Sequence, residues 1–344
     1  MTEPQDNQSA AYNVQTDYNT LTKYFLHEQQ QVGAKATGDF TILLNAIQFT
    51  CKVIAHNIRR ANLLSLGGLA GGSNSTGDEQ KKLDIISNDI FLDAMKACGR
   101  VSVIISEEEE EAIIVEGVNG KYCVACDPID GSSNLDAGVS VGTIFGIYRV
   151  KEGSTGSLSD VLRSGTEMIV AGYCMYAASA NLIITTGKGL NGFTLDSALG
   201  EFILTHPNMK IPKSRSIYSV NEGNSMYWDE PCKKYFESLK YPESGGKPYS
   251  ARYIGSMVAD VHRTLLYGGI FAYPADTKSK NGKLRVLYEC FPMAMIVEQA
   301  GGLATDGKQR ILDLVPKEIH ERSGIFLGSE EEVKKLQGFY SKYA

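Results

Sequence analysis

The sequence predicts an α/β protein made of two packed subdomains. Its 344 residues exceed what one small hydrophobic core usually serves. Short β-branched and apolar runs, which suit strands, are concentrated in the first half of the chain, after segments whose apolar residues recur at helical spacing. A break near 205–215, which contains prolines, precedes a second half with its own helical patterns. We therefore expect a flexible arm at 1–20 and domains at 21–205 and 206–344.

Composition and charge exclude several function classes. The chain is 43% apolar and 22% charged, as in an ordinary soluble globular protein. Its net charge of -6 disfavours nucleic acid as a partner, because nucleic acid requires a basic surface. No apolar run approaches the ~20 residues of a membrane span, and the polar first residues lack a hydrophobic signal core. The scattered cysteines favour reduced thiols and a cytoplasmic location.

Two helices are expected at the start of the first domain. The first covers 21–31 and is interrupted by the glycines that follow it. Thr37 or Asp39 can cap the second helix. From 41 to 62 the apolar residues recur at helical spacing while lysine and arginine occupy other faces. This pattern predicts a long amphipathic helix.

A glycine-rich stretch at 66–77 follows this helix. Stretches of this kind are either solvated loops or lids over a functional site, and both interpretations stay open. Another helix is expected at about 87–98. The other expected elements are strands at about 101–105, 112–116, 121–127, 141–150, 168–178, 181–186 and 192–195, and helices near 228–240, 255–267 and 287–300.

The segment 127–134 carries the strongest chemical signal. Asp127 and Asp130 follow an apolar strand and can both reach one hard cation, and Mg²⁺ prefers carboxylate, water and phosphate oxygens. Gly131 and the serines after it offer successive backbone N–H groups to a phosphate. Carboxylates beside a phosphate would repel it unless metal lies between them. The segment therefore predicts a metal-dependent phosphate site, although by itself it would be an ordinary turn.

Two further patterns lie close to this segment. The glutamates at 107–111 end a strand, a position where α/β proteins place ligands, although a run of acids is more often a solvated face. Cys123 and Cys126 form a C-x-x-C pair. Because positions i and i+3 of a strand face opposite sides, we interpret this pair as structural rather than as a redox or zinc site.

With these pieces in order, the chain resembles the fructose-1,6-bisphosphatase family, within the lithium-sensitive, metal-dependent sugar and inositol phosphatases. The resemblance extends from about residue 20 to 328 and rests on the blocks 106–108, 127–136, 141–149, 218–223, 251–267 and 283–289. It implies an α-β-α-β-α layered sandwich of mixed sheets with helices between and outside them. It also implies hydrolysis of fructose 1,6-bisphosphate to fructose 6-phosphate and phosphate, a step of gluconeogenesis.

The resemblance also implies roles for individual residues. Two or three Mg²⁺ ions (Mn²⁺ or Zn²⁺ as alternatives) would be held by Glu107, Glu108, Asp127, Asp130, Glu289 and the Ile129 carbonyl. Asp84 and Glu108 would orient and deprotonate the attacking water, consistent with the requirement for a general base. The substrate would meet Asp130, Gly131, Ser132, Ser133, Asn221, Arg252, Tyr253, Met257, Tyr273, Lys283 and Arg285, with Arg285 also placed among the catalytic groups.

An inhibitory AMP site and a homotetramer built as a dimer of dimers are implied in the same way. Arg252 would reach the site of a neighbouring subunit. The AMP residues would be Thr37, Gly38, Asp39, Thr41, Lys121, Tyr122 and Arg149, with Asp39 standing where the family usually has a glutamate. Helix capping is the alternative role for Thr37 and Asp39.

Other functions compete with this one. Sedoheptulose-1,7-bisphosphatases and inositol phosphatases share the metal core, but the blocks 252–257 and 273–283 favour fructose 1,6-bisphosphate. A protein of another class, a catalytically silent sensor of AMP or metal, would be favoured by loss of a metal carboxylate or of Asp84. All of these residues are present.

Overall fold

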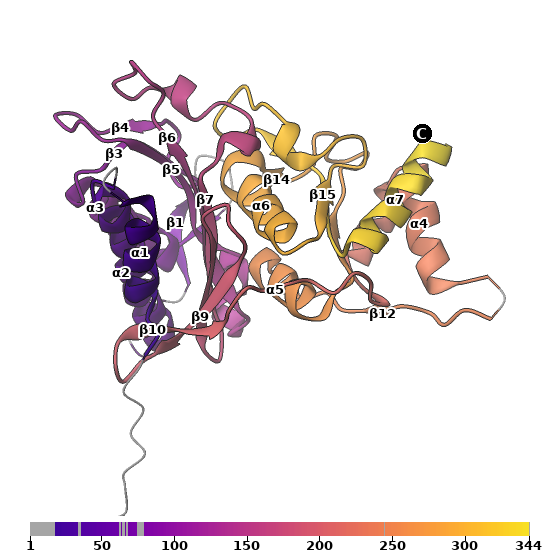
Figure 1. Ribbon diagram of the computed structural model, residues 1–344. Coiled ribbons are helices and arrows are strands. Elements are labelled where there is room, and N and C mark those ends of the chain that lie inside the picture. Colours follow the sequence, from indigo (N-terminus) through magenta and orange to yellow (C-terminus); the bar gives the residue numbers. More distant parts are fainter. Residues whose placement is uncertain are drawn as a thin grey trace, which may run out of the picture.

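The computed structural model describes residues 18–33, 36–61, 63, 66, 68–73, 79–243 and 245–343. The expected arm at 1–20 therefore lies outside the described residues, except for its last three. The described chain forms five layers in the order α-β-α-β-α, which Figure 1 shows from left to right. The layered sandwich that the sequence predicts is confirmed.

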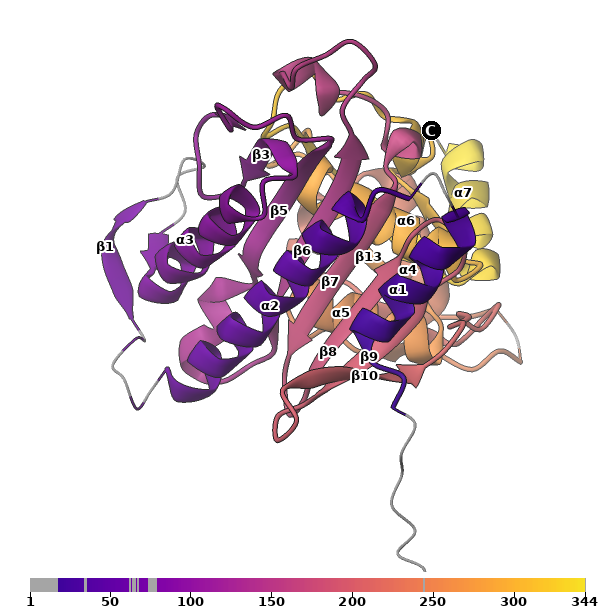
Figure 2. The same cartoon turned by 60° about the vertical axis from the view of Figure 1, so that its left-hand side comes forward.

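Three helices form the first layer and cover one face of the large sheet (Figure 2). They are α1 (Leu21–Val32), α2 (Asp39–Arg60) and α3 (Lys82–Ala97). The expected caps of α2 are wrong, because Gly38 is the N-cap at φ +80° and Asp39 is the first helical residue. The Thr37 hydroxyl instead donates to the Asp39 carboxylate over 2.7 Å.

The start of α3 is earlier than the sequence suggests. Residue Asp84 lies in the first turn, and its Oδ2 accepts a hydrogen bond of 2.8 Å from the backbone N–H of Lys81. This side-chain contact satisfies one of the N–H groups that a helix start leaves unpaired. A candidate catalytic carboxyl therefore also fixes the beginning of its own helix.

The large sheet has eight strands in the order β10-β9-β8-β7-β6-β5-β3-β4. Neighbouring strands are antiparallel except for β3 and β5, which are parallel. The strands are β3 (Val101–Ser106), β4 (Ile113–Ile114), β5 (Tyr122–Asp130), β6 (Val141–Arg149), β7 (Val170–Tyr176), β8 (Ala180–Thr185), β9 (Asn191–Asp196) and β10 (Glu201–His206). Of these, β10 was not expected.

The middle helical layer lies between the two sheets. It contains α5 (Met257–Tyr267) and α6 (Phe291–Gln299), the second preceded by a π-helical turn (Val286–Cys290). The core of this layer also includes Cys123 from the large sheet, whereas Cys126 belongs to the core beneath α1–α3. The two thiols face opposite sides of β5, as their spacing predicts.

A second sheet and two outer helices complete the sandwich. The sheet has the strand order β12-β11-β13-β17-β15, and its far face packs against α4 and α7. The bounds are β11 (Ile217–Ser219), β12 (Ser250–Ala251), β13 (Ile270–Tyr273), β15 (Leu303–Thr305), β17 (Ile325–Gly328), α4 (Glu230–Lys240) and α7 (Glu330–Tyr343). The helix α7 was not expected from the sequence, although Val333, Leu336 and Tyr340 are buried at helical spacing.

Two short antiparallel pairs lie outside the main sheets. They are β1 (Leu69–Ser73) with β2 (Glu79–Lys81), and β14 (Leu284–Arg285) with β16 (Arg322–Ser323). The glycine-rich stretch thus includes one strand of a hairpin, while residues 74–78 lie outside the described residues. None of the described helices combines the length and apolarity that crossing a bilayer needs. All seven cysteines are described, and none forms a disulfide.

Candidate active site

A bulge in β5 brings two carboxylates to the same side of the sheet. Asp127 pairs with Ile144 of β6, and Asp130 pairs with Gly142. The two aspartates are three residues apart on β5, whereas their partners are two residues apart on β6. In a regular strand, residues three apart face opposite sides, and the extra residue of a bulge reverses that relation. Pro128 sits inside this bulge, where a missing backbone N–H costs little. The motif is therefore part of a strand, and the turn begins only at Gly131.

The bulge opens onto a cavity of about 580 Å³. Its lining includes all the predicted catalytic and metal-ligating residues and most of the substrate residues. These are Asp84, Glu107, Glu108, Asp127, Ile129, Asp130, Gly131, Ser132, Ser133, Asn221, Tyr253, Tyr273, Lys283, Arg285 and Glu289. Lys81, Gly255 and Leu284 also line it. Lys81 was not among the predicted site residues, although its place three residues before Asp84 at a helix start is a usable signal.

Three buried carboxylates converge at the base of this cavity. Oxygen atoms of Asp127, Asp130 and Glu289 lie within 4.8 Å of one another. Glu289 comes from the π-helical turn, a rare conformation that is frequent at functional sites. One oxygen of Asp130 accepts from the Val258 backbone N–H over 3.0 Å, whereas Asp127 Oδ1 is buried without a hydrogen-bond partner among the described residues. Buried oxygens arranged in this way suit a hard divalent cation.

Electrostatics point to the same conclusion. Burial, reinforced by the neighbouring carboxylates, raises the pKa of Asp127 and of Glu289 well above the ordinary range. Burial likewise raises the pKa of Asp130 to about 6 and that of Glu107 to about 7. A bound divalent cation would be the largest local charge and would reverse these shifts. The residues present therefore fit a metal centre.

Asp84 lies beside this cluster with one oxygen uncommitted. Its Oδ2 is occupied by the Lys81 backbone N–H, but Oδ1 is buried and makes no hydrogen bond within the described part of the chain. Burial, together with the nearby charge of Glu108, raises the pKa of Asp84 to about 7. A carboxyl with a pKa near neutrality is suited to take a proton from water.

Donors for phosphate line the same cavity as the carboxylates. Ser132 and Ser133 begin a short 3₁₀ helix (Ser132–Ala137) after Gly131, whose φ of +78° favours glycine. Arg285 is buried, and its Nη2 lies 3.8 Å from Glu107 Oε1. The exposed Lys283 extends the positive charge toward the mouth of the cavity.

Two predicted substrate residues do not line the cavity. The Arg252 side chain is exposed and donates to the Ala251 carbonyl over 2.9 Å. Met257 begins α5, and its side chain is buried in the core of the middle layer. Within one chain, neither side chain is part of the cavity lining, although the backbone N–H that follows Met257 donates to Asp130.

A second cavity of about 300 Å³ collects the predicted AMP residues at the N-terminus of α2. Its lining includes Thr37, Gly38, Thr41, Lys121, Tyr122 and Arg149. The Arg149 guanidinium lies 5.7 Å from the centre of the Tyr122 ring. The Asp39 carboxylate is not in the lining, because it pairs with Lys121 Nζ at 2.5 Å and with Arg100 Nε at 2.7 Å.

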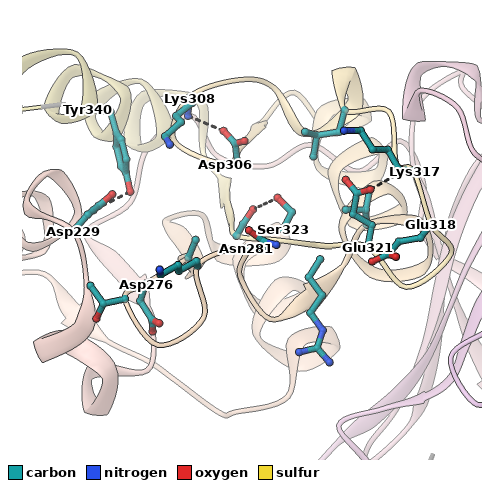
Figure 3. Close-up of a pocket in the computed structure, with 17 residues that line it drawn as sticks. Asp229, Asp276, Asn281, Asp306, Lys308, Lys317, Glu318, Glu321, Ser323 and Tyr340 are labelled. Atoms are coloured by element: carbon teal, nitrogen blue, oxygen red, sulfur yellow. Dashed lines mark hydrogen bonds between the residues drawn. The ribbon is translucent and has the colours of Figure 1, made fainter. Parts of the chain in front are cut away.

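A larger cavity, of about 740 Å³, lies in the second half of the chain (Figure 3). It is rich in acids, but these carboxylates serve the local backbone. Asp306 accepts from the N–H groups of Lys308 and Gln309, and Glu321 accepts from that of Lys317. Among the described residues, the carboxylates close enough to share a metal ion are Asp127, Asp130 and Glu289, and none of the acids of this cavity belongs to such a group.

The raised pKa values predict how stability depends on pH and metal. Between the ordinary carboxyl pKa and the raised values, the folded chain retains protons that the unfolded chain has lost. Without metal, the stability due to these groups therefore falls as the pH rises from ~4 toward 7. Metal competes with protons for the carboxylates, so its stabilising effect grows over the same range. We expect the Tm difference between Mn²⁺ and EDTA samples to be small at about pH 5.5 and several-fold larger at about pH 8. A Tm difference that is constant with pH would contradict this.

Comparison with known proteins agrees with the fold and the site. The family models described as fructose-1-6-bisphosphatase N-terminal domain and C-terminal domain match residues 19–207 and 211–341. The chain is 57% identical over 340 residues to a protein of Oryza sativa subsp. indica named cytosolic fructose-1,6-bisphosphatase, covering 98% of this chain and 99% of that one. A relative of the same name from Spinacia oleracea is 57% identical over 95% of this chain and 96% of its own length.

A solved structure gives the same result. Fructose-1,6-bisphosphatase of Leishmania major in its holo form has a TM-score of 0.89 and 49% identity, covering 94% of this chain and 99% of that one. The likeness in sequence and in structure thus extends over both halves of the sandwich. The chain belongs to the fructose-1,6-bisphosphatase family.

Proposed function

We propose that this protein is a cytosolic, metal-dependent phosphatase that hydrolyses fructose 1,6-bisphosphate to fructose 6-phosphate and phosphate. One observation carries the proposal: buried carboxylates and phosphate donors line a single cavity. The relatives named above carry this activity in their names. The metal and AMP sites belong to the first half of the chain, apart from Glu289, and most substrate contacts belong to the second.

The carboxylate cluster would hold two or three Mg²⁺ ions, with Mn²⁺ and Zn²⁺ as alternatives. The ligands would be Glu107, Glu108, Asp127, Asp130, Glu289 and the Ile129 carbonyl. When bound, the ions would supply a Lewis acid for the phosphoryl oxygens and lower the pKa of bound water.

The residues of the chain provide the remaining steps. Asp84 accepts a proton from the attacking water at its uncommitted Oδ1, and Glu108 helps to orient that water. Arg285 and the N–H groups of Ser132 and Ser133 donate to the phosphoryl group that is transferred. The water attacks phosphorus directly, the bond to the sugar oxygen breaks, that oxygen takes up a proton from solvent, and no phospho-enzyme forms.

The distal phosphate and the sugar would meet other residues of the same lining. Asn221, Tyr253, Tyr273 and Lys283 line the cavity and offer hydrogen-bond donors and a positive charge to a dianion. From the sequence blocks 252–257 and 273–283 we expect a preference for fructose 1,6-bisphosphate over sedoheptulose 1,7-bisphosphate and inositol phosphates. The proposed tetramer would add Arg252 from a neighbouring subunit.

Arg252 offers a test of this last contact. We expect Arg252→Ala to raise the KM for fructose 1,6-bisphosphate by about 10-fold with little change in kcat, because a charged hydrogen bond contributes about 1.5–3 kcal/mol. Steady-state kinetics and light scattering on the same samples measure the effect and the assembly. Arg215→Ala, which changes another exposed arginine, is the control. Equal KM values for the two variants would refute a role of Arg252 in the neighbour's site.

The activity itself is tested by phosphate release from fructose 1,6-bisphosphate with Mg²⁺, with EDTA and with AMP. Turnover that EDTA abolishes is the expected result. Cleavage of sedoheptulose 1,7-bisphosphate or inositol phosphate instead would keep the metal chemistry and overturn the sugar assignment. Binding of AMP and metal with no turnover of any of these substrates would favour the silent sensor.

A further inference from the structure

His320 connects two segments that carry candidate metal ligands. Its Nδ1 lies 2.7 Å from the Tyr288 hydroxyl, and its Nε2 lies 3.0 Å from the carbonyl oxygen of Glu109. A carbonyl oxygen only accepts, so Nε2 carries the proton and Nδ1 accepts from the hydroxyl. Burial holds the pKa of His320 below its usual value, in keeping with a neutral ring. Both ring nitrogens are therefore committed.

One end of this connection lies in the π-helical turn. Tyr288 is fully buried and immediately precedes Glu289, the only candidate metal ligand that the second half of the chain provides. The Tyr288 and His320 rings meet edge to face, with centres 5.9 Å apart. Movement of the His320 ring would therefore displace Tyr288 and with it the backbone that carries Glu289.

The other end lies in the turn after β3. Glu109 follows Glu107 and Glu108, and its own carboxylate accepts from Asn88 Nδ2 over 2.7 Å. The Asn88 side chain also accepts from Ser106 Oγ at 2.7 Å. Asn88 belongs to α3, so this turn is held by the first helical layer on one side and by His320 on the other.

In the part of the chain that the structure describes, no sheet ladder makes this connection. β3 belongs to the large sheet, whereas Glu289 belongs to the middle layer. His320 lies in the segment that provides Lys317, Glu318 and Glu321 to one wall of the cavity in Figure 3. The segment that contains His320 thus joins the turn after β3 to the π-helical turn, and it does so through side-chain hydrogen bonds.

We infer that His320 is a positioning residue that, with Tyr288, holds the Glu107–Glu108 turn and Glu289 at the spacing at which they share divalent cations. The inference rests on the proposed metal dependence. Without metal, the clustered carboxylates repel one another and favour separation of the two segments. The hydrogen bonds of His320 oppose that separation, so the cation meets a preformed site. Outer-shell partners of this kind typically change metal affinity or activity by about 10–100-fold.

The test measures Mn²⁺ binding directly, by electron paramagnetic resonance of free Mn²⁺ with EDTA-stripped protein and no substrate. We expect His320→Ala and Tyr288→Phe each to weaken binding about 10-fold or more. His320→Gln keeps an N–H donor at the depth of Nε2 and should recover most of the affinity. At saturating Mn²⁺, kcat and the substrate KM should return close to the parent values.

The chain offers a matched control. The Tyr173 hydroxyl lies 2.9 Å from Nδ1 of His262, with ring centres 6.0 Å apart, between β7 and α5. Tyr173 is fully buried, like Tyr288. Tyr173→Phe should therefore lower Tm about as much as Tyr288→Phe but leave Mn²⁺ affinity unchanged.

The outcomes separate the inference from the proposed function. Equal Mn²⁺ affinity in Tyr288→Phe and Tyr173→Phe, or loss of kcat at saturating metal without loss of affinity, would overturn the positioning role. Binding is measured without substrate, so failure to hydrolyse fructose 1,6-bisphosphate leaves this result interpretable.

Discussion

Replacing Asp127 with asparagine should abolish turnover of fructose 1,6-bisphosphate and stabilise the metal-free protein. Asp127 supplies one of the three converging carboxylates of the proposed metal site. Loss of an outer-shell partner alone costs about 10–100-fold, so loss of a direct ligand should reduce kcat/KM by more than about 100-fold. Asparagine has the same shape, which limits damage to the fold. Phosphate release with saturating Mg²⁺ measures the first effect.

The stabilising effect follows from the electrostatics of the metal-free cluster. Asp127 is buried at 2% exposure, its Oδ1 has no hydrogen-bond partner among the described residues, and its pKa is raised by burial and by Glu107. Asparagine has no group to ionise, so it removes the cost of either burying a charge or keeping a proton on the carboxyl near neutral pH. In EDTA at about pH 7.5, we expect the unfolding free energy of Asp127→Asn to exceed that of the parent by roughly 1–3 kcal/mol. Added Mn²⁺ should remove this difference, because it binds and stabilises the parent protein.

Asp160 provides a control with the opposite sign. It is also fully buried, but it accepts hydrogen bonds from Ser154 Oγ and from the backbone N–H groups of Lys151 and Ser157. Although burial opposes it, these bonds hold the pKa of Asp160 below its usual value. Asp160→Asn should therefore destabilise the protein in EDTA and leave kcat of the folded fraction near the parent value. Turnover within a few-fold of the parent in Asp127→Asn would contradict the metal assignment.

The sequence predicts the parts of this site that depend on local pattern. An apolar run before Asp127 indicates the strand, and the acids at strand ends indicate the cluster. The bulge in β5 could not be predicted, because it depends on the register with β6, which is set by pairing along both strands. The sequence thus predicts that Asp127 and Asp130 reach one cation, whereas the bulge that brings them to one side of the sheet is a tertiary result. The same holds for Glu289, whose direction is set by a π-helical turn.

The fold shows the same division. Long amphipathic helices such as α2 are visible in the spacing of apolar residues, whereas β12 and β14, of two residues each, are too short to show any alternation. The prediction of the α2 caps was wrong for a specific reason. The Asp39 side chain forms ion pairs with Arg100 and Lys121, which are distant in sequence. Ion pairs between distant segments leave no periodic signal.

The second large expected effect is on AMP inhibition. Because Lys121 and Asp39 form an ion pair, substitutions of the two residues should shift this inhibition in opposite directions. In the proposed AMP cavity, Lys121 Nζ is paired with Asp39 at 2.5 Å. AMP would need the same ammonium group for its phosphate, so the carboxylate competes with the ligand. We expect Lys121→Ala to raise the AMP concentration for half-inhibition by about 10–100-fold, the value of one charged hydrogen bond, with AMP-free activity unchanged.

Asp39→Asn should act in the opposite sense. It removes the competing charge, and it leaves the Asp39 backbone N–H at the N-terminus of α2, where helices bind phosphate. The half-inhibiting AMP concentration should therefore fall. Lys52→Ala is the control, because Lys52 lies on the same helix in an ion pair with Glu201 at 3.0 Å, away from the cavity lining. Unchanged inhibition in Lys121→Ala would mean that residues 37–41 only begin a helix and do not bind AMP. Weaker inhibition in Asp39→Asn would mean that the Asp39 carboxylate contacts AMP directly. Opposite shifts in the two variants, with none in Lys52→Ala, would identify the Lys121–Asp39 pair as the contact that AMP must break.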